Sequence, residues 1–259
     1  MKHFLRVAII AGILLIDGTG IVSAQNIRSI SSYSFIDYDG IGASNVFEST
    51  VIVPVNGRFS ALVRGYYDNR KTWNNTIITF GTIVMLGEYN YMELSYGYGH
   101  DKVGKHADFM SFDVTREKNR YLATVGLRHR IYPSFSMTTV SPGIRYFITD
   151  GFSLWGKIFT SADSNGQYDY ATWLEATYSF SDRVTVSSGG TFGNRLYSTQ
   201  YDNLYYSTEK SPDISFHSYI GKIIWQANRR VSISYLFEAM TRQKTNHDTK
   251  NTLVVDIKM

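Results

Sequence analysis

The sequence predicts an all-β fold, a closed antiparallel transmembrane β-barrel of about 14 strands. Three observations lead to this fold class. Apolar and polar residues alternate in many segments, short and long connections alternate between these segments, and an export signal heads the sequence. Strict alternation gives a strand one apolar and one polar face. In lipid such a sheet must close, because each unpaired backbone group at an open edge costs several kcal/mol.

The first 24 residues are expected to be a cleaved signal peptide. A basic start precedes an apolar core over 7–16, and Ala24 completes the small-x-small pattern that signal peptidase cuts. The alternative, an anchoring helix, needs about 20 continuous apolar residues, and Asp17 interrupts the run well before that. We therefore expect two parts, a signal peptide over 1–24 and an outer-membrane barrel over 25–259.

Alternation is clearest in residues 120–131. Apolar side chains at Tyr121, Ala123, Val125, Leu127 and Ile131 alternate with polar ones at Arg120, Thr124, Arg128 and Arg130. Strands of this kind are expected at 28–37, 44–54, 58–68, 73–85, 90–99, 107–115, 120–131, 135–148, 152–161, 167–180, 183–193, 214–226, 230–241 and 251–259. The faces are ambiguous in 28–37, 73–85 and 214–226, where a β-bulge would fit. Twelve strands remain the alternative if two of the segments lie outside the wall.

The connections follow a regular order. Those after even-numbered segments are tight, at 54–57, 116–119, 149–151, 181–182 and 227–229, and most of those after odd-numbered segments are longer, at 99–106, 161–167, 194–213 and 242–250. This order is typical of a barrel with periplasmic termini, short inner turns and long outer loops. The connection at 132–135 is shorter than the rule predicts.

A soluble β-sandwich is the alternative fold. Its dry core would exclude the Arg and Glu residues that stand in mid-segment on the polar faces, whereas a wet lumen accepts them. Aromatic residues gather at segment ends, where membrane girdles form: Tyr66, Tyr67, Tyr96, Tyr98, Tyr132, Tyr178 and Phe180. The expected location is therefore the cell outer membrane of a Gram-negative bacterium.

The expected partners follow from that location. Outer-membrane lipid and lipopolysaccharide would surround the barrel, and the barrel assembly machinery would insert it. The last segment alternates up to Met259, at a place where such barrels usually end in an aromatic residue. The 26 Lys+Arg against 22 Asp+Glu are too evenly balanced to indicate a nucleic-acid partner.

Several short motifs of aromatic, glycine and turn residues follow one another along the chain. They are YSFIDYDG (33–40), YGYGHD (96–101), ADF (107–109), VGLRHRIY (125–132), SPGIRYF (141–147) and the segment 151–162 followed by DSNG (163–166). In order and spacing they resemble the YaiO-type outer-membrane barrels over most of the mature chain. The resemblance implies a small single-domain barrel and brings no catalytic residues.

The polar faces supply the candidate lining of the lumen. Charged residues expected there are Arg58, Arg64, Glu93, Asp113, Arg120, Arg128, Arg130, Arg145, Lys157, Glu175 and Glu238. One interpretation is a ladder of ion pairs that stiffens the wall and narrows any pore. The other is a polar channel with a slight preference for anionic or sugar solutes. The long connection 194–213 would plug the lumen if it folded inward.

Enzyme signals are weak. Ser164-Asn165-Gly166 resembles the end of an outer-membrane phospholipase motif, but Ala162 stands where the base must be. Absence of cysteine excludes a thiol nucleophile and a thiolate metal site. We expect no catalytic residue, no cofactor and no metal. The expected function is a pore for small polar or anionic solutes or glycans; the alternatives are a non-conducting barrel that docks partners through its outer loops and, third, a hydrolase.

Overall fold

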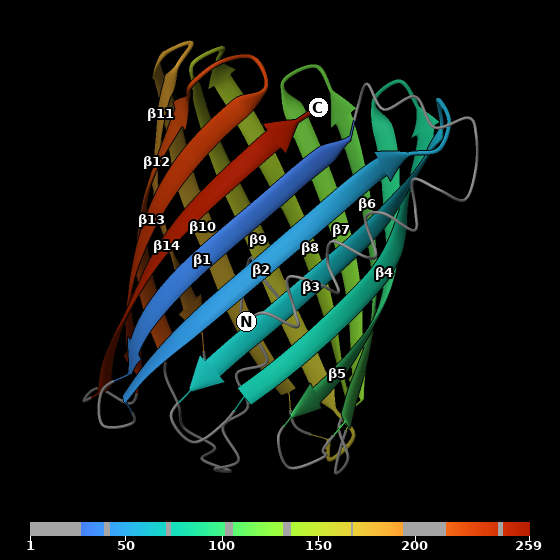
Figure 1. The fold of residues 1–259 in the computed structure, drawn as a ribbon. Helices are drawn as coiled ribbons and strands as arrows, with labels where there is room; N and C mark the ends of the chain where they lie inside the picture. The colour runs from blue at the N-terminus through green and yellow to red at the C-terminus, as the bar shows by residue number, and fades with distance from the viewer. Residues whose placement is uncertain are drawn as a thin grey trace.

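The computed structural model describes residues 27–38, 42–70, 74–101, 106–131, 136–166, 168–193, 216–242 and 246–259. These form a closed barrel in which each strand pairs antiparallel with its neighbour in sequence and β1 pairs with β14 (Figure 1). The strands are β1 (Arg28–Tyr38), β2 (Gly42–Pro54), β3 (Phe59–Arg70), β4 (Asn74–Gly87), β5 (Asn90–Asp101), β6 (His106–Lys118), β7 (Tyr121–Ile131), β8 (Ser136–Thr149), β9 (Phe152–Asp163), β10 (Tyr168–Ser181), β11 (Val184–Gly193), β12 (Phe216–Gln226), β13 (Val231–Arg242) and β14 (Asn246–Lys258). None of the described residues forms a helix long and apolar enough to cross a membrane.

The short connections after the even-numbered strands all lie at the end of the barrel where β14 finishes, which is uppermost in Figure 1. We call this the turn end and the opposite one the loop end. Side chains close these turns: the Asn56 carboxamide oxygen accepts the N–H groups of Arg58 and Phe59, and that of Asn228 accepts those of Arg230 and Val231. Asx turns of this kind satisfy backbone donors that the sheet leaves open.

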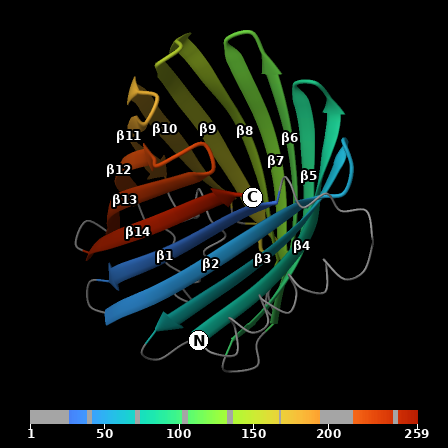
Figure 2. The ribbon, with the colours of Figure 1, turned by 45° about the horizontal axis from the view of Figure 1, so that its top comes forward.

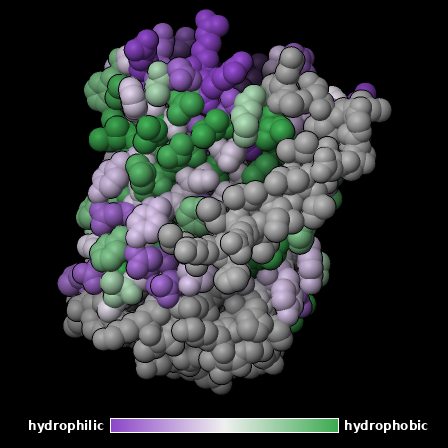
Figure 3. Space-filling model, in the orientation of Figure 1, coloured by the Kyte–Doolittle hydropathy of each residue, from purple (hydrophilic) through white to green (hydrophobic). Residues whose placement is uncertain are grey.

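The outer face of the barrel is apolar. Leu127, Ile158, Leu174 and Ile223 are among the many large hydrophobic side chains that are about half exposed. Figure 3 shows a hydrophobic band across the strands of one face, below a hydrophilic rim at the turn end. A soluble protein would not expose apolar surface on this scale, whereas a membrane requires it.

Aromatic residues border this band on both sides. Near the turn end the rings of Tyr121 and Tyr146 lie 4.9 Å apart, and that of Tyr178 lies 4.8 Å from Phe180. On the outer face, three tyrosine hydroxyls are directed toward the loop end and donate to polar side chains one strand away: Tyr33 to Asn45, Tyr96 to Asp108 and Tyr235 to Asn251. Such pairs suit a boundary at which lipid gives way to water.

The expected strand number is confirmed, and the alternative of twelve strands is wrong. β14 begins at Asn246, earlier than the expected 251. The register shifts only near Met85/Gly87, Phe147/Thr149 and Ser179/Ser181 among the described pairings, all at the turn end. The bulges considered in 28–37 and 214–226 are absent from the described parts, 28–37 and 216–226. These alternate regularly but carry apolar residues such as Ile36 and Ile220 on the inner face.

The lipid contact of the outer face makes a depth-dependent prediction. Leu127 in mid-β7 and Ile131 at its loop end share one face and are 43% and 41% exposed. We expect Leu127→Arg to lower the free energy of unfolding by about 2–4 kcal/mol and Ile131→Arg by about 0–1 kcal/mol, because only the first places a charge deep in hydrocarbon. Urea unfolding from lipid vesicles measures both. Equal costs would contradict the assignment of this face to lipid.

Candidate functional site on the inner wall

Residues paired in register share a face, so the residues that alternate with the exposed apolar set form the inner wall. Small hydroxyl side chains make up much of it and bond across strands. Ser95 lies 2.6 Å from Ser111, Thr139 lies 2.8 Å from Ser161, and Thr177 lies 3.0 Å from Ser187, measured between their oxygen atoms. The inner wall is therefore a mainly polar surface with charged side chains set into it.

The residues expected to line the lumen fall into two groups. Those within strands alternate with the outward apolar positions and lie on the inner face: Arg64, Glu93, Asp113, Arg128, Arg130, Arg145, Lys157, Glu175 and Glu238. Arg58 and Arg120 stand instead in turns at the turn end, just before β3 and β7 begin. Arg120 donates there to the carbonyl oxygen of Ile148, at 3.2 Å. Whether any of these residues contacts a solute stays a prediction.

Arg64 on β3 joins two carboxylates. Its Nε lies 3.4 Å from Glu48 on β2, and a terminal nitrogen lies 3.9 Å from Glu93 on β5. The second contact crosses β4, where the inner position between them is Gly81. A Cβ at Gly81 would meet the backbone oxygen of Leu94 at 2.7 Å, so this place both requires glycine and leaves room above it for the guanidinium.

Arg145, Trp155 and Glu175 are direct cross-strand neighbours on β8, β9 and β10. The Arg145 guanidinium lies 4.8 Å above the centre of the Trp155 ring and 3.3 Å from the Glu175 carboxylate. Lys222 on β12 also interacts electrostatically with Glu175 and with Arg145. On β11 between them stand only the small residues Ser187 and Gly189, over which a lysine side chain can reach.

A third charged group lies on β6, β7 and β9. Lys157 interacts electrostatically with Arg128 and Asp113. The Asp113 carboxylate lies over Gly126, its cross-strand neighbour, in space that any Cβ at that position would occupy. The Lys157 ammonium lies 5.3 Å from the centre of the Phe159 ring, a cation–π distance.

Sequence reasoning missed Lys222 and an apolar cluster on the inner face. Phe159, Ala171, Trp173, Ile220 and Leu236 pack together there, with Trp173 only 2% exposed. The inner-face residues toward the loop end, such as Ile36, Tyr66 and Ile77, are likewise buried, whereas Glu93 and Arg145 nearer the turn end are partly exposed. The inner wall is thus packed most tightly in its loop-end half.

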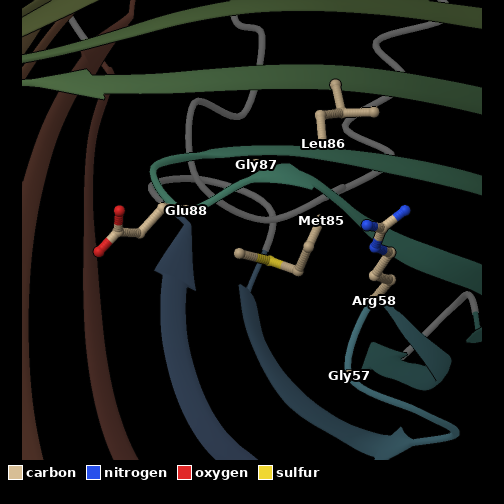
Figure 4. Close-up of a pocket in the computed structure, with 6 residues that line it drawn as sticks. All are labelled: Gly57, Arg58, Met85, Leu86, Gly87 and Glu88. Atoms are coloured by element: carbon tan, nitrogen blue, oxygen red, sulfur yellow. The ribbon is translucent and has the colours of Figure 1, made fainter.

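A separate hollow of about 420 Å³ lies at the turn end, lined by Gly57, Arg58, Met85, Leu86, Gly87 and Glu88. Figure 4 shows Arg58 and Glu88 on opposite sides of Met85. The N–H of Met85 donates to the carbonyl oxygen of Arg58 at 2.8 Å, which ties the two turns together. The hollow belongs to the rim and not to the charged part of the wall.

The described residues offer little to catalysis. The Ser164 hydroxyl accepts the N–H of Ser136, and the N–H of Gly166 donates to Asp163, so this segment is a turn. His129 lies 2.9 Å from the Thr138 hydroxyl on the outer face, and none of the described bonds joins His129 to a carboxylate that would orient it. No group of three or more His, Asp or Glu is placed to hold a metal among the described residues.

A closed antiparallel barrel with an apolar exterior and a polar, charged interior defines an outer-membrane β-barrel. No family model matches the sequence, and no curated protein is similar to it in sequence. The resemblance to the YaiO-type barrels therefore stays a prediction.

Three solved structures with the same fold are distant from this chain in sequence. The chain is similar to the CymD monoaromatic hydrocarbon channel (TM-score 0.61, 8% identity, 91% of this chain and 89% of that one). It is also similar to a bacterial polysaccharide outer membrane secretin (0.59, 9%, 91% and 99%) and to a FadL homologue of Pseudomonas aeruginosa (0.58, 9%, 90% and 90%). At these identities the likeness shows the fold.

The ion pairs of the wall can be tested by stability. The side chains of Arg64 and Glu48 are 25% and 9% exposed, so Arg64→Met leaves two carboxylates without their shared cation. We expect the free energy of unfolding to fall by about 2 kcal/mol, between the costs of an exposed and a buried pair. Arg28→Met is the control, because Arg28 is 44% exposed in its pair with Asp256 and should cost about 0–1 kcal/mol. Urea unfolding compares them; equal losses would contradict a structural role for the Arg64 pairs.

Proposed function

We propose that the protein is an outer-membrane channel for small polar or anionic solutes. The observation that carries the proposal is a row of cations on three adjacent strands of the inner wall. Arg130 and Arg128 stand toward the loop end of β7, Lys157 in mid-β9 and Arg145 toward the turn end of β8. An anion that crosses the barrel along this wall would meet a cation at each stage.

The partial solvent exposure of these side chains supports the proposal. Arg128, Arg145 and Lys157 are neither buried nor fully exposed, as expected of charges that border water within a barrel, whereas Arg130 is buried, at 7% exposure. The mild excess of cations would give a preference and not a strict selection, since acidic residues such as Glu175 accompany them. Proteins of similar fold are as different as a hydrocarbon channel and a polysaccharide secretin. The charged wall, and not the fold, therefore favours the anionic class.

The proposal predicts a charge-dependent conductance. Refolded protein in a planar bilayer should conduct ions and show a reversal potential that indicates anion preference in a salt gradient. Arg128→Glu with Arg130→Glu should lower the anion-to-cation permeability ratio at least severalfold, because it reverses two charges of the row. Arg128→Lys with Arg130→Lys should preserve the ratio.

The matched control is Arg116→Glu. Arg116 lies on β6 beside this wall, but its cross-strand partners are Asn90 and Ala123, and Ala123 belongs to the outer face. Together with Lys118→Glu on the same face of β6, this variant reverses two charges, as the double Glu variant does, and it should leave the permeability ratio unchanged. A folded barrel without conductance would overturn the proposal, and an unchanged ratio in the double Glu variant would remove these arginines from the path.

A further inference from the structure

The charged residues of the inner wall are separated by sign around the barrel. The inner face of β2 to β6 carries three of these carboxylates and one cation: Glu48, Glu93 and Asp113 with Arg64. The inner face of β7 to β12 carries four cations and one carboxylate: Arg128, Arg145, Lys157 and Lys222 with Glu175. We call these the acidic sector and the basic sector.

Neighbouring contacts join residues within each sector, and Asp113 also interacts with Lys157 across the boundary between β6 and β7. Within the acidic sector Glu93 and Asp113 are direct cross-strand neighbours, and Arg64 contacts both Glu48 and Glu93. Within the basic sector Glu175 is shared by Arg145 and Lys222. Each minority charge therefore lies among an excess of opposite charges and does not cancel it. The formal charge is −2 in the acidic sector and +3 in the basic sector.

The remaining inner-face charges leave this separation in place. On β13, β14 and β1, the inner-face acids Glu238, Asp248 and Asp256 are balanced in formal charge by Lys250, Lys258 and Arg28. On β6, Glu117 adds to the acidic sector at the turn end. Nearer the loop end, Asp68 adds to the acidic sector, while Arg130, Asp163 and Asp169 together reduce the basic sector without changing its sign. The separation is a property of the described wall as a whole.

The two sectors face one another across the lumen. In a closed ring of fourteen strands, β2 lies opposite β9 and β5 lies opposite β12. The strand with Glu48 thus faces the strand with Lys157, and the strand with Glu93 faces the strand with Lys222. Figure 2, which looks partly down the barrel, shows β2 and β9 on opposite walls.

Opposite charges on opposite walls create an electric field across the lumen. The field acts within a protein boundary of low polarity, where the potential between charged walls is stronger than in bulk water. A solute with a single charge is attracted by one wall and repelled by the other. A solute that carries both a cation and an anion gains from both walls when it aligns with the field.

We propose that the channel favours small zwitterions with an ammonium group toward the acidic sector and a carboxylate toward the basic sector. The inference rests on the proposed channel function and names its solute class. It differs from a simple anion preference, because removal of the acidic sector should weaken zwitterion passage while it strengthens anion passage.

The test compares two isomers, glycine, which is a zwitterion, and glycolamide, which is neutral. Swelling of proteoliposomes measures the entry of each. Because the two molecules have the same size, a pore without a transverse field should pass glycine no faster than glycolamide. The intact protein should pass glycine at least severalfold faster. Glu48→Gln with Glu93→Gln should abolish that advantage, and Lys157→Gln with Lys222→Gln should do the same from the other wall.

The matched control is Glu88→Gln with Asp150→Asn, which removes the same two negative charges from exposed turn residues at the turn end. This control should keep the advantage of glycine. The mobility of unheated protein in a detergent gel reports whether each variant has formed its barrel. If both isomers enter at equal rates through the intact protein, the zwitterion inference is overturned, while the proposed channel function is still supported. If neither isomer enters, the channel proposal falls, and this inference falls with it.

Discussion

One constraint governs the molecule: within hydrocarbon, each backbone N–H and C=O of the wall must find its partner inside the sheet. The pairing of β1 with β14 satisfies this constraint by closing the sheet. The pairing extends to the last residue, since the N–H of Met259 donates to the carbonyl oxygen of Ile27 at 2.7 Å. Closure fixes the register of every strand pair. Because side chains alternate with a period of two, the register then decides which residues meet lipid and which meet the lumen.

The charged contacts are consequences of that register. Arg145 and Glu175 are 30 residues apart in sequence, yet they lie in one cross-strand row with Trp155 between them. Glycines complete the arrangement at two places, Gly81 beneath the reach of Arg64 and Gly126 beneath Asp113. A larger side chain at either place would clash with the backbone or with a carboxylate. Glycine at these positions leaves the space in which the charged side chains lie close to one another.

The sequence predicted the outer face better than the inner one, for a physical reason. Lipid favours apolar side chains, so the outer positions of a strand such as β7 are apolar except for His129. The inner face accepts polar, charged and apolar residues alike, so the pattern in β12, with Lys222 next to Ile220, identified neither face. Arg58 was expected within a strand. Its N–H group instead donates to the Asn56 side-chain oxygen, and this hydrogen bond places Arg58 in the turn. Contacts of this kind depend on geometry that a residue pattern does not contain.

The apolar cluster of the inner wall bears on the charges beside it. Trp173 is the cross-strand neighbour of Lys157, and Leu236 that of Lys222, so two cations of the basic sector stand against buried hydrocarbon. Water is excluded on that side, and a charge at such a boundary is screened less than one surrounded by solvent. The aromatic faces of Trp155 and Phe159 offset part of the cost of desolvation through their contacts with Arg145 and Lys157. In the proposed channel, these apolar residues would strengthen the field across the lumen, because they direct the unscreened part of each charge toward the opposite wall.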